Sequence, residues 1–476
     1  MTPDQVIARF AYMEPFVGLT ADGAVSVVDE AGLRDGAIDR LIRDAVFGPV
    51  EQRAAARWLI WEMGQALGIR PASIQDFYMA RGRGDVPADF TVPAMNLRGI
   101  SYYMARAVFR AALKLDVGAM IFEIARSEIG YTDQRPGEYT AAMLAAAIKE
   151  GYRGPVFIQG DHFQVSAKSF ASHPDKEVGA VRDLITEAIK AGFFNIDIDT
   201  STLVDLGPAE LMEQQRQNYQ VSSALTAFIR SVEPEGITIS VGGEIGEVGG
   251  KNSTEPELRA YMDGYNKSLA QFDGDLVGLS KISIQTGTSH GGVVLPDGTL
   301  AQVKIDFDTL KRLSIVAQQE YGMAGAVQHG ASTLPDSAFR NFTEARACEV
   351  HLATGFQNII YEHAALPAEV REKAYAYIKE HHANEWKEGQ TEDQFIYKTR
   401  KKAFGGVKSA WWGLSDDVLR QIGASLEDKF AFLFEQLNAP GTRNLVNQFV
   451  KAPEVHKTPE DFVPQAELAM AKDLAD

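Results

Sequence analysis

The sequence predicts an α/β fold, a (β/α)8 TIM barrel with helical extensions at both ends. Between residues 89 and 364, short apolar runs alternate with longer amphipathic segments, which is typical of βα units around a parallel sheet. The short runs number eight, the count that closes such a barrel. An open doubly wound sheet would carry a glycine-rich phosphate turn after its first strand, and Met95–Ile100 contains no such pattern.

The chain divides into three predicted parts. Residues 1–88 show helical periodicity and end in the turn-rich stretch Arg81–Ala88, so they form a helical N-terminal extension. Residues 89–364 form the barrel, a fold that needs only about 250 residues. Residues 365–476 return to a helical period, as in Leu414–Leu437, and form a C-terminal extension that serves as a cap or a subunit contact.

Each predicted strand is a short apolar run, and each predicted helix repeats apolar residues at the spacing that buries one face. The strands are Phe90–Asn96, Gly118–Ala125, Val156–Asp161, Phe193–Asp199, Thr238–Glu244, Leu279–Thr286, Gly325–His329 and Glu349–Thr354. The helices between them include Tyr102–Leu115, Ala141–Glu150, Lys176–Ala191, Ala209–Ser231, Pro256–Gln271 and Asp306–Tyr321.

Composition and charge exclude several classes of protein. The chain is 45% apolar and 23% charged, as in ordinary globular proteins and unlike disordered ones. A net charge of −17 repels phosphate backbones and anionic lipids, so we expect no nucleic-acid or membrane partner. An anionic substrate would need a local cation. The dense basic run Lys398–Lys408 is either solvated surface or a feature that brings such a substrate to the site.

The sequence also bears on the compartment. The first twenty residues contain Asp4, Arg9 and Glu14 with no continuous apolar stretch, and no later segment approaches eighteen apolar residues in a row. We therefore expect a cytoplasmic protein. The single cysteine, Cys348, excludes an internal disulfide and a cysteine-rich zinc site, and we expect a buried, inert thiol there.

Ionisable side chains gather where the predicted strands end. The chain has nine histidines, and four of them fall at or just beyond strand ends, together with three acids. These residues are Asp161, His162, Asp199, Glu244, His290, His329 and His351. Catalytic groups of a TIM barrel project from the C-terminal ends of its strands, so this pattern predicts an active site there.

The adjacent Asp161 and His162 allow two interpretations. One is an imidazole that binds a metal ion beside an acid that transfers protons, and the other is a capped turn with a satisfied histidine. His290 and His329 each precede a glycine, which lets backbone amides approach a phosphate or an oxyanion. Three imidazoles at one rim fit a tetrahedral zinc site with one open position.

These residues, in their order and spacing, resemble the class II, metal-dependent fructose-bisphosphate aldolases and relatives that act on other ketoses. The similarity covers roughly residues 90 to 362 and neither extension. The resemblance implies that Asp161 is the proton-transferring acid/base and that His162, His290 and His329 bind a divalent metal ion. Zinc is the expected ion, with manganese or cobalt as alternatives.

The resemblance also implies roles for residues around the ion. The segment Gly243–Gly250 is similar to the family's ELG…GG segment, which makes Glu244 a ligand of a displaced metal position or a partner of the ligands. Asp199 is similar to the acid that holds a second cation. The implied substrate contacts are Asn96, Ser127, Gly291, Ser332 and Thr354.

Four departures from the family pattern lie around the expected substrate rather than on the metal ion. They are Lys251-Asn252 where acids are usual, Gly292–Val294 where a lysine is usual, Ala331 for a glycine, and His351 for Asn or Asp. We therefore expect a substrate other than fructose 1,6-bisphosphate, with His351 among its contacts. Lys251 either restores a positive charge near that substrate or is an exposed lysine.

The resemblance implies a metal-dependent aldolase, a lyase of carbohydrate metabolism that cleaves or forms the C3–C4 bond of a ketose phosphate or related ketose through a metal-stabilised enediolate. The alternative is a ketose C4-epimerase that breaks and re-forms this bond at the same metal site. A non-catalytic structural subunit is the third reading, although loss of activity usually removes ligands or the base first. We expect a small sugar or sugar phosphate as the partner, and a homo-oligomer.

Overall fold

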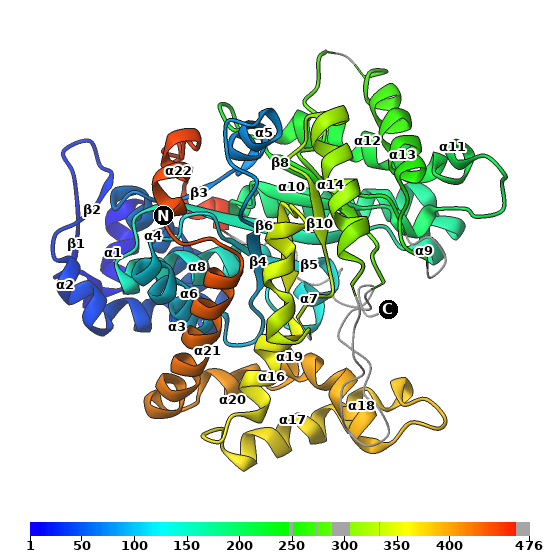
Figure 1. Cartoon of the computed structure of the whole chain (residues 1–476). Coiled ribbons are helices and arrows are strands. Elements are labelled where there is room, and N and C mark those ends of the chain that lie inside the picture. The colour runs from blue at the N-terminus through cyan, green and yellow to red at the C-terminus, as the bar shows by residue number, and fades with distance from the viewer. Residues whose placement is uncertain (247–250, 273, 288–304, 333, 463–476) are drawn as a thin grey trace.

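The computed structural model describes residues 1–246, 251–272, 274–287, 305–332 and 334–462. Within these residues, eight parallel strands close into a barrel in chain order, with β6 pairing to β7 and β11 pairing back to β4 (Figure 1). The barrel strands are β4 (Val92–Asn96), β5 (Ile121–Ala125), β6 (Gly154–Gln164), β7 (Asn195–Asp199), β8 (Ser240–Glu244), β9 (Lys281–Ile284), β10 (Ala326–Gln328) and β11 (Glu349–Leu352). The predicted TIM barrel and all eight predicted strands are confirmed.

The barrel strands are buried on both faces, because helices cover the outside and side chains fill the inside. Cys348 lies in this core, where its thiol donates to the carbonyl oxygen of Ala326 over 3.3 Å. Burial raises the pKa of the thiol to about 12, so the predicted buried cysteine is confirmed and stays protonated at neutral pH.

Helices connect the strands and pack around them. They are α6 (Ser101–Leu115), α7 (Arg126–Tyr131), α8 (Pro136–Glu150), α9 (Ala167–Ser172), α10 (Pro174–Ala191), α11 (Leu211–Gln214), α12 (Arg216–Val232), α13 (Glu255–Leu269), α14 (Phe307–Tyr321), α15 (Arg340–Glu344) and α16 (Thr354–Glu362). Local sequence sets their ends: Thr254 and Glu257 cap the first turn of α13 reciprocally, and α10 stops at Gly192, whose φ is 98°. None of the described helices combines the length and apolar character needed to cross a membrane.

The N-terminal part contains strands as well as the predicted helices. Its elements are α1 (Pro3–Arg9), β1 (Val17–Leu19), β2 (Val25–Val27), α2 (Glu30–Gly32), α3 (Ile38–Phe47), α4 (Val50–Ala66), β3 (Ile69–Ala72) and α5 (Gln75–Arg83). β1 and β2 form a small antiparallel sheet, and β3 pairs in parallel with the first residues of β6. Strands of three or four residues are too short to show a period in sequence. The division of the chain at residues 88 and 364 stays a prediction.

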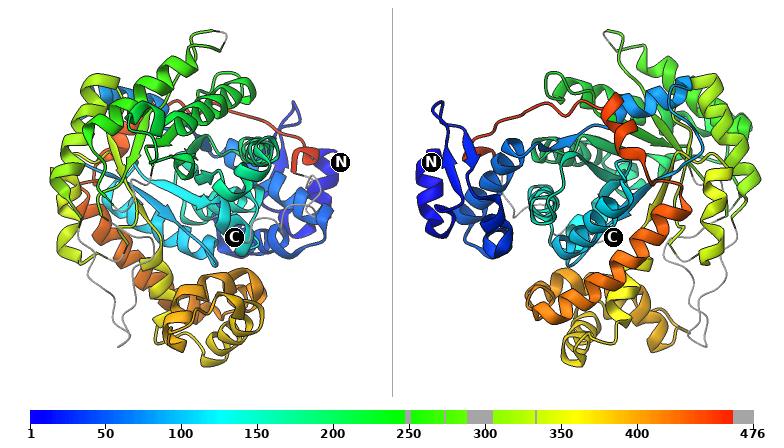
Figure 2. Two further views of the ribbon diagram at one scale, coloured as in Figure 1. Left: turned by 90° about the vertical axis from the view of Figure 1, so that its right-hand side faces the viewer. Right: turned by 60° about the vertical axis from the view of Figure 1, so that its left-hand side comes forward.

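The C-terminal part wraps around the barrel. It comprises α17 (Ala368–His381), α18 (Glu392–Thr399), α19 (Ala403–Gly406), α20 (Lys408–Trp412), α21 (Asp416–Gln436) and α22 (Thr442–Phe449). Helices α17 to α20 gather at one end of the molecule, and α21 packs along α6 (Figure 1). The chain then returns to the N-terminal elements (Figure 2), where the indole N–H groups of Trp58 and Trp61 donate to the carbonyl oxygens of Lys457 and Val455 over 2.8 and 2.7 Å.

Candidate active site

A cavity of about 280 Å³ opens where the barrel strands end. The predicted site residues that line it are Asn96, Ser127, Asp161, His162, His329, Ser332, His351 and Thr354. Among the other lining residues, Arg98, Glu123 and Glu128 were not singled out in the sequence, whereas Lys401 belongs to the basic run Lys398–Lys408. The strands therefore bring together residues far apart in the sequence, at the barrel end where catalytic groups are expected.

Asp161 and His162 both face this cavity although they are neighbours in a strand, where successive side chains normally point to opposite faces. The pairing of β6 with β7 shifts between Gly160 and Phe163, and His162 has a φ of 41°, in the left-handed region. This β-bulge turns the two side chains to the same side. A histidine in that conformation is strained, and such strain gathers at functional sites.

His162 lies among carboxylates and a second imidazole. Its Nδ1 is 2.9 Å from Asp199 Oδ2 and 3.3 Å from Glu244 Oε2, and its ring centroid is 4.4 Å from that of His329. Ligand atoms of Asp161, His162 and His329 lie within 4.8 Å of one another, as do those of His162, Asp199 and Glu244. Two imidazoles and three carboxylates form a donor set that suits zinc, manganese or cobalt.

The electrostatics of this cluster favour a cation. Burial acts to raise the pKa of Asp199, but hydrogen bonds, including one with His162, outweigh it and lower the pKa to about 2. Burial and the charge of Asp199 raise the pKa of Glu244 to about 7. Burial acts to lower the pKa of His162, but Asp161 and Glu244 raise it well above its usual range. Carboxylates crowded around one imidazole in this way hold protons that a divalent ion can replace.

His351 extends from β11 into the floor of the cavity. Its Nδ1 lies 3.2 Å from Asp161 Oδ1 and 3.0 Å from Glu123 Oε2, and its Nε2 lies 2.7 Å from Glu349 Oε1. Burial acts to lower the pKa of His351, but Glu123 and the other carboxylates raise it well above its usual range. Its Nε2 also lies 3.7 Å from Asp197 Oδ2, so the ring has four carboxylates around it, including the predicted acid/base.

A buried lysine lies beneath His351 inside the barrel. Lys281 Nζ is 3.0 Å from Asp197 Oδ2 and 2.7 Å from Gln159 Oε1, and it donates a short hydrogen bond to Glu349. Burial acts to lower the pKa of Lys281, but Asp197 and Glu349 raise it above its usual value. Burial acts to raise the pKa of Glu349, but Lys281 holds it well below its usual range. The barrel interior is thus a layer of paired charges below the cavity.

Three of the predicted site residues are not among the described residues that line the cavity or surround His162. His290 and Gly291 lie outside the described residues. Lys251 is exposed and is not among the described residues that line the cavity. The sequence did not single out Glu123, Lys281 or Glu349, although each is a charged residue inside an otherwise apolar run, which was a readable signal.

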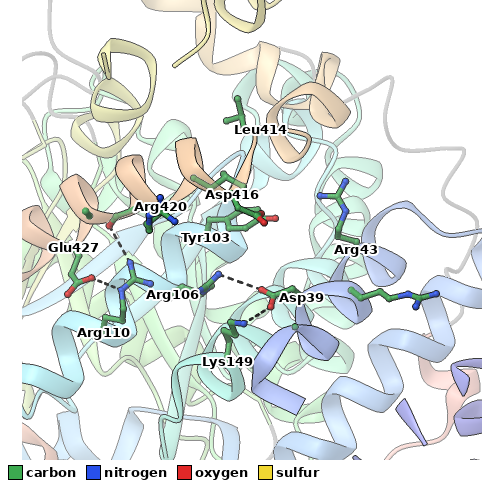
Figure 3. Close-up of a pocket in the computed structure, with 15 residues that line it drawn as sticks. Asp39, Arg43, Tyr103, Arg106, Arg110, Lys149, Leu414, Asp416, Arg420 and Glu427 are labelled. Carbon is green, nitrogen blue, oxygen red and sulfur yellow. Dashed lines mark hydrogen bonds and ion pairs between the residues drawn. The ribbon is translucent and has the colours of Figure 1, made fainter. Parts of the chain in front are cut away.

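A larger cavity, of about 840 Å³, lies away from the strand ends, between α3, α6 and α21. Figure 3 shows Arg106 and Lys149 directed toward Asp39, and Arg110 directed toward Glu427. Arg106 and Lys149 contact Asp39 over 3.5 and 2.5 Å, and Arg110 contacts Glu427 over 2.5 Å. These ion pairs join both extensions to the barrel. Its described lining contains no histidine, so the cavity at the strand ends is the candidate active site.

Comparison with known proteins gives one family and several structures. Residues 87–406 match the family described as fructose-bisphosphate aldolase class-II. A Sinorhizobium meliloti 1021 protein described as a probable tagatose 6 phosphate kinase is 17% identical, with 78% of this chain and 96% of that one covered and a TM-score of 0.50, which supports the fold. The YdjI aldolase from Escherichia coli K12 is 13% identical, with 78% of this chain and 99% of that chain covered and a TM-score of 0.44. A fructose-bisphosphate aldolase from Campylobacter jejuni is 16% identical, with 78% and 97% covered and a TM-score of 0.45. No curated protein sequence matches the chain.

Proposed function

The chain belongs to the class II fructose-bisphosphate aldolase family, and from this premise we propose that it is a metal-dependent aldolase. The reaction is cleavage or formation of the C3–C4 bond of a ketose phosphate or related ketose. The observation that carries the proposal is the bulge in β6, which places Asp161 beside an imidazole and carboxylate cluster at the strand ends. A proton-transferring acid next to a metal-binding cluster is what this chemistry needs.

The side chains that would hold the ion are His162, His329, Glu244 and Asp199. His290, which lies outside the described residues, is the further proposed ligand. A divalent ion bound there would act as a Lewis acid, stabilising the negative charge that develops on the substrate carbonyl oxygen as the C3–C4 bond breaks. The buried carboxylates around His162 favour binding of the ion, because its positive charge would replace the protons that they hold on His162 and Glu244.

Asp161 is the proposed acid/base. In cleavage its carboxylate accepts the proton of the C4 hydroxyl, C4 becomes an aldehyde carbon, and the electrons of the broken bond pass to the C3 fragment. In condensation the same proton returns to the C4 oxygen. His351, 3.2 Å from Asp161 Oδ1, holds the carboxylate in position. The remaining proposed substrate contacts in the cavity are Asn96, Ser127, Ser332 and Thr354.

A second candidate is a ketose C4-epimerase that breaks and re-forms the same bond without releasing the fragments. The observation that favours it is that Lys401, from the C-terminal part of the chain, contributes to the cavity wall. Further side chains of this part that cover the cavity would help to retain both fragments. A non-catalytic subunit is disfavoured because the acid/base and the imidazoles are together in one cavity.

Product analysis separates these candidates. The metal-loaded protein is incubated with fructose 1,6-bisphosphate, tagatose 1,6-bisphosphate and their less phosphorylated forms, and all carbon products are followed by NMR. Triose fragments that an Asp161→Asn variant cannot make establish the aldolase. Conversion of one ketose to its epimer without trioses establishes the epimerase. No turnover of any of these ketoses, by a protein that retains its ion, would contradict both.

A further inference from the structure

Lys401 places a positive charge in the wall of the candidate active site. It belongs to the 3-10 turn Arg400–Lys402 in the C-terminal part of the chain, and it lines the cavity with Arg98. Its Nζ lies 5.5 Å from the centroid of the Tyr131 ring. Across the described residues, Lys401 forms no hydrogen bond or ion pair with another side chain.

The other cations of the same basic run are neutralised. Arg400 pairs with Glu362 over 2.8 Å and Lys402 pairs with Glu385 over 2.6 Å. Lys408 pairs with Glu138 over 2.8 Å. These partners lie outside the described lining of the cavity. Lys401 differs from them in that it lines the cavity and pairs with no carboxylate among the described residues.

Arg98 supplies a second, oriented cation. Its Nη2 lies 2.9 Å from Glu128 Oε1, its Nη1 donates to the Tyr131 hydroxyl over 2.8 Å, and its Nε donates to Asn96 Oδ1 over 3.2 Å. These contacts fix the plane of the guanidinium group. Glu128 is the only carboxylate among the described residues that ion-pairs with either cation, so this wall keeps a surplus of positive charge.

The surplus charge is costly without a ligand. Burial and the charge of Arg98 lower the pKa of Lys401 to about 8, whereas Glu128 and Glu385 act to raise it and Lys402 acts to lower it. A partly buried ammonium group that lacks an anionic partner is destabilised. A bound anion would remove that penalty, because it would restore the missing partner.

We propose that Lys401 and Arg98 form an anion subsite that binds the phosphate or carboxylate group of the ketose substrate. The inference rests on the proposed function, since it takes the cavity to hold a ketose. It gives the C-terminal part of the chain a role in choosing the substrate: ketoses with an acidic group are bound and neutral ketoses are not. Phosphate and carboxylate share the oxyanion chemistry that ammonium and guanidinium groups recognise.

Binding measurements test the subsite without turnover. Glycerol 3-phosphate, glycerate and glycerol are titrated into the metal-loaded protein at pH 7 by calorimetry, so that a phosphate, a carboxylate and a neutral probe are compared. We expect Lys401→Gln to weaken the preferred anion by about 10- to 100-fold, the effect of losing a hydrogen bond between charged groups. Lys401→Arg should stay within about threefold of wild type because the charge remains.

The matched control is Lys398→Gln, which removes the same charge from an exposed position in the same run. It should bind both anions as the wild type does. Equal affinity of Lys401→Gln and wild type for both anions would overturn the inference.

If the Gln variant does not fold, a pH series on the wild type tests the inference instead. The anion affinity of the wild type should fall as the pH rises above about 8, and a constant affinity up to pH 9.5 would overturn the inference. Ketose cleavage that depends on Asp161, together with anion binding insensitive to Lys401, would leave the proposed function standing.

Discussion

His351 Nδ1 lies 3.2 Å from Oδ1 of Asp161, and its Nε2 lies 2.7 Å from Oε1 of Glu349. The imidazole therefore connects the proposed acid/base to a carboxylate at the floor of the barrel. The sequence predicted His351 as a substrate contact, and its place in the cavity lining is compatible with that. The contacts with carboxylates indicate a further role, which is to position Asp161.

His351→Asn distinguishes these two roles. If His351 positions Asp161, kcat falls by about 10- to 100-fold with little change in KM, because a small displacement of a catalytic group costs about that much. Steady-state kinetics over a range of substrate concentrations measures both constants. A raised KM with unchanged kcat would instead identify a substrate contact alone.

Asp161→Asn should lower kcat by about 10²- to 10⁴-fold, the usual contribution of a general acid/base. The bound metal should be retained, because His162, His329, Glu244 and Asp199 are intact in this variant. Steady-state kinetics measures kcat, and elemental analysis of the same preparation measures the metal content. A variant that keeps full activity would remove Asp161 from the proposed role.

Removal of the ion should abolish turnover and lower the thermal stability. A ligand present at about 1,000 times its Kd stabilises the folded state by about 4 kcal/mol, so chelation should shift the melting temperature downward.

His162→Ala and His329→Ala should purify with less than one ion per chain. His363→Ala is the matched control, because His363 contacts Ser425 over 3.1 Å in another part of the molecule. Full occupancy in all three variants would contradict the proposed ligands.

Metal affinity should depend on pH with a defined sign. Glu244 has its pKa raised to about 7 by burial and by Asp199, so protons compete with the ion at and below that pH. The affinity should therefore rise as the pH increases from about 5.5 to 8, and the raised pKa of His162 extends the rise to higher pH. Competition with a chelator of known affinity at each pH measures it. An affinity that does not change over this range would show that Glu244 is not a ligand.

Lys281→Met should destabilise the fold strongly. The substitution removes the ammonium group from the buried Glu349 and the largely buried Asp197, and breaking a buried pair in this way costs about 3–5 kcal/mol. The matched control, Lys311→Met, changes an exposed lysine and should alter the free energy of unfolding by less than about 0.5 kcal/mol. Urea denaturation at pH 7 compares them. The same small effect for both lysines would mean that the interior ion pairs are not needed for stability.

The barrel could be predicted because each strand is buried on both faces and therefore appears as an apolar run. The strand β3 and the β1–β2 pair could not, since three or four residues carry no period. The strand ends also predicted Asp161, His162, His329 and His351, which line the cavity, and the family resemblance added Asn96, Ser127, Ser332 and Thr354. Glu123, Lys281 and Glu349 were missed because the search was confined to those ends, whereas these three charges lie within the strands.

Two features of the site depend on geometry that a linear sequence does not contain. The adjacency of Asp161 and His162 is visible, but the bulge that turns both into one cavity depends on a left-handed φ at His162. The basic run Lys398–Lys408 is equally visible. That Lys401 alone among its basic residues lines the described cavity follows from the packing of the C-terminal part, which no local pattern encodes.

The most direct test of the account measures the dependence of carbon–carbon bond cleavage on the ion and on Asp161 together. Wild type and Asp161→Asn are each prepared metal-free and zinc-loaded, and all four samples are incubated with ¹³C-labelled ketose phosphates while the products are followed by NMR. We predict that zinc-loaded wild type alone changes the labelled ketose by a C3–C4 bond change, seen as triose fragments or as the C4 epimer. Equal product formation by metal-free wild type or by zinc-loaded Asp161→Asn would contradict the account.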